Sequence, residues 1–138
     1  MTVATFQSMD TQTEETAGEL VGSRHLDDPI RELDLETARQ KAWAALDKSD
    51  THHTARTLVK LPTLRVVLMV LRRGAEVPEH TAEGDVTLHV LRGRIGVRVD
   101  GQHKRLHAGQ LISIERLQPH ALEGLEESEV LLSLGWPP

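Results

Sequence analysis

The sequence predicts an all-β domain, built as a barrel or a two-sheet jelly roll and preceded by one amphipathic helix. From residue 56 onward, short runs rich in Val, Ile and Leu follow the two-residue period of strands and are separated by turn signals. No helical segment lies between these runs, which excludes a parallel βαβ sheet. Eight or nine short strands in this arrangement are expected to close into a barrel or to form two packed sheets.

The length and composition limit the class of protein. The 138 residues are enough for one domain with a core of its own. The chain has no cysteine, which excludes disulfides and thiolate metal sites. It has no apolar run of about 18 residues, and its first residues lack the basic and apolar parts of a signal peptide. We therefore expect no membrane span and a cytoplasmic location.

The net charge of −5 is unevenly distributed along the chain. Residues 1–55 contain eleven acidic and five basic residues, whereas residues 56–138 contain ten acidic and eleven basic ones. The predicted barrel is therefore close to neutral. Its basic residues are not interleaved with aromatic ones, since Phe6, Trp43 and Trp136 are the only aromatic residues of the chain. We expect no nucleic-acid partner.

Three segments are predicted along the chain. Residues 1–28 form an acidic leader whose polar composition cannot bury enough apolar surface to offset the entropy of ordering. Residues 29–50 contain the helix, and residues 55–138 form the barrel.

The helix is predicted from apolar residues that recur at helical spacing, namely Leu35, Ala38, Ala42 and Leu46. Asp34 is placed to cap its first turn. Because a helix of this length is not stable alone, its apolar face must pack either on the barrel or on a partner subunit.

The barrel strands are predicted at residues 56–61, 64–73, a short segment ending at residue 80, then 86–92, 95–100, 103–106, 110–115, 120–125 and 129–136. The clearest turn is Asp100-Gly101, because this dipeptide favours the positive φ angles of a tight hairpin.

Two spaced motifs make this part of the chain resemble the cupins. In the first motif, Gly74 is followed by five residues and then His80, and the motif closes at Gly93 in the sequence VLRG. In the second motif, His120 follows Gly109 at a spacing of eleven residues. The resemblance implies a cupin-type double-stranded β-helix, that is, a jelly-roll barrel.

The resemblance covers about residues 64–134, but it departs from the metal-binding cupins at the ligands. In those proteins two histidines and a glutamate of the first motif join the histidine of the second motif on one ion. Here the second histidine and the glutamate are replaced by Ala82 and Val86. Only His80 and His120 remain, whereas zinc and non-haem iron sites take three or more protein ligands.

The second motif departs from the pattern as well, with Glu115 and Leu117 in place of its usual proline and glycine.

His89 is the first candidate for a third ligand. Strand alternation argues against it, because Val86, Leu88 and Val90 share one face, which is the inner face in the family. His89 should then point outward unless a bulge reverses the order. Weaker candidates are Glu83, Asp85 and Glu123.

The substitutions make the inner wall of the barrel more apolar, which is typical of a small-molecule pocket. The predicted pocket is lined by His80, Ala82, Val86, Leu88, Val90 and His120. We interpret the chain as a small cupin that binds a small molecule.

Two alternatives stay open. One is a metal-dependent oxygenase or isomerase that binds a divalent ion (Zn, Fe, Mn or Ni) through His80, His120 and a third ligand such as His89. The other is a purely structural or regulatory dimer. The sequence leaves open whether any reaction is catalysed.

A homodimer is expected in each case, because the outer face of residues 86–92 and the apolar face of the helix both require burial.

Overall fold

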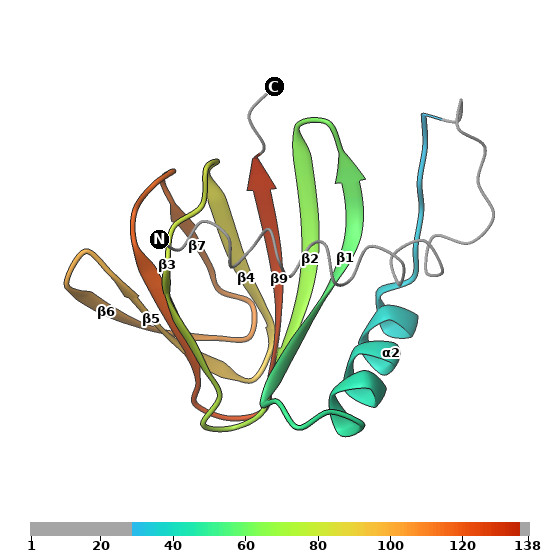
Figure 1. The fold of residues 1–138 in the computed structure, drawn as a ribbon, viewed down its shortest axis with the longest axis horizontal. Coiled ribbons are helices and arrows are strands. Elements are labelled where there is room, and N and C mark those ends of the chain that lie inside the picture. Colours follow the sequence, from blue (N-terminus) through green and yellow to red (C-terminus); the bar gives the residue numbers. More distant parts are fainter. Residues whose placement is uncertain (1–28, 136–138) are drawn as a thin grey trace.

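The computed structural model of the protein describes residues 29–135, so the predicted leader, residues 1–28, lies outside the described part. Within it one helix precedes nine strands (Figure 1). Their bounds are α2 (Leu35–Asp47), β1 (His53–Leu61), β2 (Leu64–Leu71), β3 (Glu76–His80), β4 (Val86–Arg92), β5 (Arg94–Val99), β6 (Gln102–His107), β7 (Leu111–Ile114), β8 (His120–Gly124) and β9 (Ser128–Gly135). Each predicted strand overlaps one of them. The helix in this part of the chain is too short and too polar to cross a bilayer.

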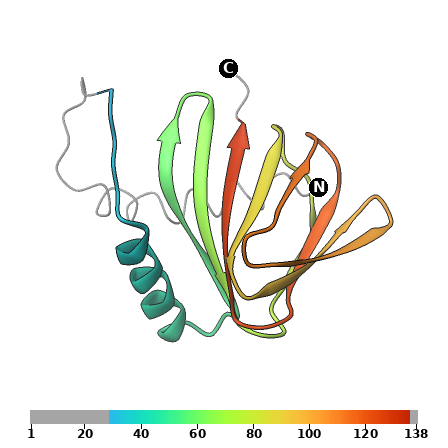
Figure 2. The same cartoon turned by 180° about the vertical axis from the view of Figure 1, so that it is seen from behind.

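The strands form two antiparallel sheets that face each other. The first has five strands in the order β1-β2-β9-β4-β7, and the second has four in the order β3-β8-β5-β6. The helix lies at one side of the molecule, and the β5–β6 hairpin projects at the opposite side (Figures 1 and 2). This arrangement confirms the predicted jelly-roll barrel with an N-terminal helix.

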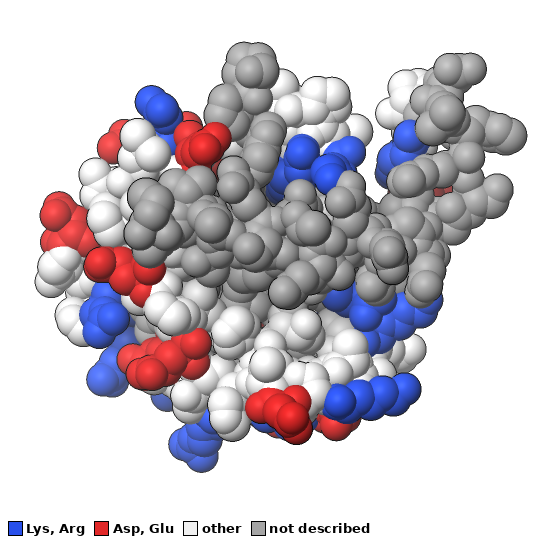
Figure 3. Space-filling model, viewed as in Figure 1, with Lys and Arg blue, Asp and Glu red and all other residues white. Residues whose placement is uncertain are grey.

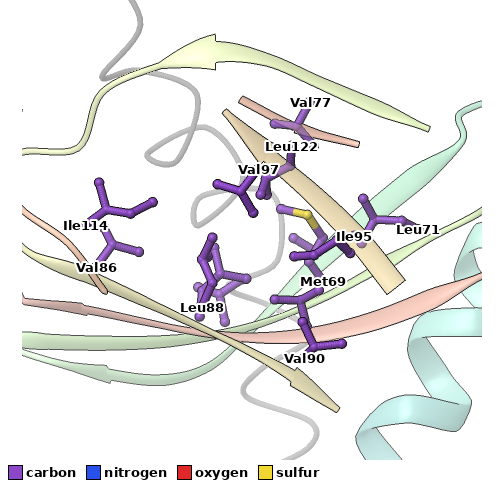
Figure 4. Packing of buried hydrophobic residues seen from close by; sticks show 14 of the residues in the cluster. Met69, Leu71, Val77, Val86, Leu88, Val90, Ile95, Val97, Ile114 and Leu122 are labelled. Carbon is purple, nitrogen blue, oxygen red and sulfur yellow. The ribbon is translucent and has the colours of Figure 1, made fainter. Parts of the chain in front are cut away.

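The main core fills the space between the two sheets. Along β4, Val86, Leu88 and Val90 are buried and alternate with half-buried residues. They face Ile95 and Val97 of the opposite sheet (Figure 4). Each fully buried Val, Leu or Ile side chain contributes about 1.5–3 kcal/mol, so this layer holds the two sheets together.

A second cluster lies on the outer face of the five-stranded sheet, under α2. Ala38, Ala42 and Leu46 are fully buried against Leu68 and Val70. Of the two locations predicted for the apolar face of the helix, the barrel of the same chain is therefore the observed one. Leu35, predicted for the same face, remains 37% exposed.

The first turn of the helix is arranged differently from the expected cap. Asp34 is the N-cap residue, but its side chain forms no capping hydrogen bond to the backbone. Its carboxylate accepts a hydrogen bond of 2.8 Å from the hydroxyl of Thr37 instead.

A buried carboxylate fastens the helix to the sheet. Glu129 of β9 is only 1% exposed and lies on the outer face, beneath α2. Its Oε1 accepts a hydrogen bond of 2.5 Å from Nε of Arg39, and its Oε2 accepts one of 2.7 Å from the indole nitrogen of Trp43. The carboxylate holds the pKa of the Arg39 guanidinium above its usual value.

Two turns of the chain require the positive φ angles that glycine adopts readily. Asp100 and Gly101 have φ angles of 51° and 73°, which confirms the predicted hairpin turn. At Gly93 φ is 85°, and an added Cβ would lie 2.2 Å from the carbonyl oxygen of Glu127. No other residue fits between β4 and β5 without moving the backbone.

Leu117 adopts the left-handed conformation at a position where the resemblance implies glycine. Its φ is 67° and its side chain is 50% exposed, so little packing compensates for the backbone conformation. The left-handed region costs an L-residue about 1–2 kcal/mol. We expect Leu117→Gly to raise the free energy of unfolding by about 0.5–1 kcal/mol in urea denaturation, since glycine itself loses more chain entropy.

Leu61 provides a matched control for this prediction. It is 43% exposed but extended, in β1. Leu61→Gly should therefore lower the free energy of unfolding by about 0.5–1 kcal/mol. A decrease of similar size in both variants would show that the conformation of Leu117 carries no strain.

Candidate functional site

The two histidines that keep the motif spacing lie side by side inside the barrel. His80 ends β3, His120 begins β8, and the two are register partners across these strands. Their ring centroids are 4.4 Å apart, and the ring planes are inclined at 62°. Both side chains are buried, with exposed fractions of 0% and 1%. The antiparallel pairing of β3 and β8 thus brings together two residues that are forty positions apart in the sequence.

The backbone of its own strand end orients each ring. Nδ1 of His80 donates a hydrogen bond of 2.8 Å to the carbonyl oxygen of Pro78. Nδ1 of His120 donates one of the same length to the carbonyl oxygen of Gln118. In both cases the acceptor lies two residues earlier in the chain, so the two rings are held by the same local geometry.

Burial keeps both imidazoles in the neutral state. It lowers the pKa of His80 to about 4, and the neighbouring His120 lowers it further, although the hydrogen bond to Pro78 opposes the shift. Burial also lowers the pKa of His120, against the opposing effects of its bond to Gln118 and of the Glu79 carboxylate. At neutral pH the pair is therefore a polar but uncharged element within an apolar core.

A cavity of about 410 Å³ is lined by sequence and register neighbours of His120, although neither histidine is itself part of its lining. Across the four-stranded sheet, Gln102, Val99, His120 and His80 are successive register partners and form one row. Residues directly opposite one another in antiparallel strands share a face, so the row lies on the inner face. The cavity occupies the end of this row, lined by Val99, Asp100, Gln102, Lys104, Ile112, Ser113, Ile114, Glu115 and Gln118. Gln118 thus lines the cavity, and its carbonyl oxygen also accepts the hydrogen bond from His120.

The other residues predicted to line the pocket lie deeper in the barrel. Ala82, Val86, Leu88 and Val90 belong to the buried core cluster. None of them lines the cavity beside His120. Its walls come mainly from the β5–β6 hairpin and β7, which were not predicted to belong to the site. Gln102 and Lys104 face inward because they are the register partners of the inward-facing Val99 and Val97. The alternation of inward and outward residues along this hairpin could have predicted their orientation.

His89 does not join the histidine pair. It is half-buried between the fully buried Leu88 and Val90, so it faces away from the barrel interior. Its register partner Leu131 packs against the cluster beneath the helix, which lies on the same outer face. Strand alternation therefore describes this strand correctly, and no bulge turns His89 inward.

The carboxylates weighed as third ligands also lie elsewhere. Asp85 accepts a hydrogen bond from the backbone N–H of Arg116, while Glu83 and Glu123 are exposed. Within residues 29–135, no group of three His, Asp or Glu side chains is placed to hold a metal ion. Two imidazoles alone do not fit the three or four protein ligands of zinc sites.

A second cavity, of about 400 Å³, is a groove on the outer face of the four-stranded sheet. Gly96 and Ala121 lie on its floor, and Glu76, Arg98 and Glu123 are among its charged walls. The thickness of the sheet separates it from the histidine pair. Acidic and basic side chains are also interspersed over the described part of the face shown in Figure 3. We therefore assign the candidate site to the cavity beside His120, where buried polar groups meet an apolar wall.

Comparisons with known proteins agree with this architecture. The family model of the cupin domain matches residues 67–134. No curated protein matches the chain.

Several solved structures share the fold. A conserved protein of unknown function from Streptococcus pyogenes is 29% identical, with a TM-score of 0.60 over 65% of this chain and 79% of that chain. A cupin superfamily protein from Desulfitobacterium hafniense DCB-2 is 17% identical, with a TM-score of 0.62 over 83% and 100%. Salicylate 1,2-dioxygenase from Pseudaminobacter salicylatoxidans is 19% identical, with a TM-score of 0.71 over 81% of this chain and 36% of that chain. Together with the two spaced motifs and the two-sheet barrel, these similarities show that the chain belongs to the cupin superfamily.

Proposed function

We propose that this protein binds a small molecule in the cavity beside His120, where His80 and His120 orient a polar group of the ligand. One observation carries the proposal: two buried imidazoles lie side by side at the end of a row whose other residues line a cavity of about 410 Å³. Buried polar groups that converge beside a concave surface are the usual makeup of a ligand site.

The composition of the cavity supports this proposal. Val99, Ile112 and Ile114 supply an apolar wall, and polar residues such as Gln102 and Lys104 are part of the lining. Its volume lies within the range of about 300–1,000 Å³ that is typical of small-molecule sites. An apolar wall supplies binding energy, and the few polar groups fix the orientation of the ligand.

A metal-dependent cupin enzyme is the second candidate. It is supported by His80 and His120, which are two of the four motif ligands and lie side by side. The fold shared with a dioxygenase also supports it. The ligand set argues against it, because His89 faces outward and the nearby carboxylates lie apart from the pair.

The two candidates are distinguished by measuring bound metal and ligand binding on the same untagged protein. Metal per chain is determined after growth with added Zn, Fe, Mn and Ni, for the wild type and for His80→Ala. Methyl NMR signals of the cavity are then followed during titration with phenol, pyrrole, furan and benzene. We expect far less than one metal ion per chain and at least one probe that shifts the signals of Val99, Ile112 or Ile114.

Matched variants locate the binding. His120→Gln should weaken binding of the probe at least tenfold, whereas His103→Gln, on the exposed strand β6, should leave it unchanged. Near-stoichiometric metal that is lost in His80→Ala would instead establish the metal enzyme. If no probe shifts the cavity signals, the proposed binding function is wrong.

We also propose a homodimer that uses the outer face of β4 and β7. The apolar face of the helix no longer supports association, because it is buried on its own barrel. Leu111, which is 61% exposed and pairs with the half-buried His89, remains as an apolar surface. Light scattering at micromolar concentration should give twice the 15.4 kDa chain mass, and Leu111→Lys should shift it toward one chain. A single-chain mass for the wild type would rule the dimer out.

A further inference from the structure

We propose that the groove on the outer face of the four-stranded sheet binds a short linear zwitterion by its two charged ends. The ammonium end lies against Glu76 and Glu123 in this proposal. The carboxylate end lies against Arg98 and Arg105. The groove is separate from the cavity beside His120, so the inference does not depend on the proposed function.

The groove is formed by side chains from all four strands of this sheet. Its volume is about 400 Å³. Successive register partners across β3, β8, β5 and β6 form one row of its lining, which consists of Glu76, Glu123, Gly96 and Arg105. Residues directly opposite one another in antiparallel strands share a face. The row lies on the outer face, because Gly96 alternates along β5 with buried residues.

The charges of the groove are separated by sign. Glu76 and Glu123 are direct partners on β3 and β8, and both are exposed. Arg98 and Arg105, also exposed, lie on β5 and β6, and Lys104 of β6 belongs to the lining on the same side. Like charges directly opposite each other in a sheet are destabilising, so a cation is favoured on the acidic side. An anion is favoured on the basic side for the same electrostatic reason.

The two sets of opposite charges do not neutralise each other. A Cβ added at Gly96 would lie 3.1 Å from Cγ and 3.2 Å from Oε1 of Glu123, so this carboxylate is directed over the floor of the groove. Even so, within residues 29–135 it forms no ion pair with Arg98 or Arg105. The floor between the two charged sides consists of the small residues Gly96 and Ala121. The groove therefore has a negative end and a positive end with an uncharged space between them.

The spacing of the strands sets the length of the ligand. The midpoint between β3 and β8 is two strand spacings from the midpoint between β5 and β6. This distance is about 9–10 Å, since neighbouring strands lie about 4.7–4.9 Å apart. Consecutive Cα atoms of a peptide are about 3.8 Å apart, so the two termini of an extended tripeptide span about the same distance. We therefore infer a zwitterion of tripeptide length, because a single amino acid cannot reach both ends.

Triglycine and its two capped forms test this inference on the full chain. Acetylation removes the ammonium group and amidation removes the carboxylate, while the length stays similar. Binding is followed through the amide signal of Gly96 and the methyl signal of Ala121. We expect triglycine to bind at least about threefold more tightly than either capped form, which is the size of effect that exposed charge pairs produce. The preference should disappear in about 1 M salt, where exposed charges are screened.

Two variants assign each end of the peptide to its partner. Glu123→Gln should abolish the preference for the free ammonium group and retain the preference for the free carboxylate. Arg105→Gln should show the reverse. Glu126→Gln is the matched control, because this residue is exposed but lies outside the groove, and it should retain both preferences. The three side chains are on the surface, so the variants are expected to fold.

The outcomes decide the inference without reference to the cavity beside His120. Equal binding of triglycine and its capped forms overturns it. A loss of both preferences to the same extent in Glu123→Gln and Arg105→Gln also overturns it, because contacts at separate ends require selective losses. If the signals of Gly96 and Ala121 do not shift, the groove is not a binding site. Shifts confined to Ile112 and Ile114 would place the peptide in the cavity beside His120 and would equally rule the groove out.

Discussion

Replacing Glu129 by alanine is expected to lower the free energy of unfolding by about 3 kcal/mol, which is typical of breaking a buried ion pair. The carboxylate is 1% exposed and accepts hydrogen bonds from Arg39 and Trp43. Its removal takes the acceptor away from the indole N–H of Trp43 and from Nε of Arg39, while Nη1 of Arg39 keeps its hydrogen bond to Glu36. Urea denaturation followed by Trp fluorescence measures the loss, because Trp43 reports on the docking of the helix.

Two further variants sharpen this expectation. Glu129→Gln retains an acceptor for Trp43 but removes the charge opposite Arg39, so its effect should be smaller than that of alanine. Glu127→Ala serves as the matched control, because this carboxylate is 66% exposed and lies 3.8 Å from Arg72. Its loss should change the free energy of unfolding by less than about 0.5 kcal/mol. Equal effects at positions 127 and 129 would show that the buried carboxylate does not fasten the helix.

Acidification from pH 6.5 to pH 4 is expected to remove about 3 kcal/mol of stability through His80 alone. Its pKa in the folded protein is about 4, because burial disfavours the charged ring, whereas an unfolded histidine titrates near 6.5. Between these pH values the unfolded chain binds a proton that the folded chain does not. The contribution is therefore fully present above pH 6.5, falls with decreasing pH and levels off below pH 4. His120 acts in the same direction, since its pKa is also lowered.

Carboxylates titrate in part of this range, so the effect of His80 must be isolated by a difference. Denaturant titrations at several pH values between 4 and 7.5 are compared for the wild type and His80→Gln, whose side chain does not titrate. The wild type should show the steeper decrease below pH 6.5. His103→Gln, on exposed β6, should follow the wild type. A pH dependence that is the same in all three proteins would contradict the lowered pKa.

The sequence was sufficient to predict the fold because its signals are local. Alternating apolar residues define strands, and a dipeptide such as Asp100-Gly101 defines a turn without reference to the rest of the chain. The apolar face of the helix could also be predicted from the sequence. The surface on which this face packs could not. Ala38, Ala42 and Leu46 pack on the barrel of the same chain.

The site was less accessible to the same reasoning. The motif spacing identified His80 and His120, but the cavity beside them is formed where β7 and the β5–β6 hairpin approach each other from different sheets. No local pattern states which inward residues of two sheets will meet. Glu129 was missed for a related reason, because its partners Arg39 and Trp43 are 90 and 86 residues away in the sequence.

The bonds from Nδ1 of His80 and His120 to carbonyl groups of their own strand ends make the pair preorganised. Ordering a free side chain at a binding site costs about 0.5–1.5 kcal/mol. A ligand that meets rings already fixed by Pro78 and Gln118 avoids this entropy loss for both residues. The orientation of the two rings also does not depend on the second motif histidine of the metal-binding cupins, whose position is taken by Ala82. The two imidazoles therefore keep their geometry even though Ala82 and Val86 stand at the positions of the other two motif ligands.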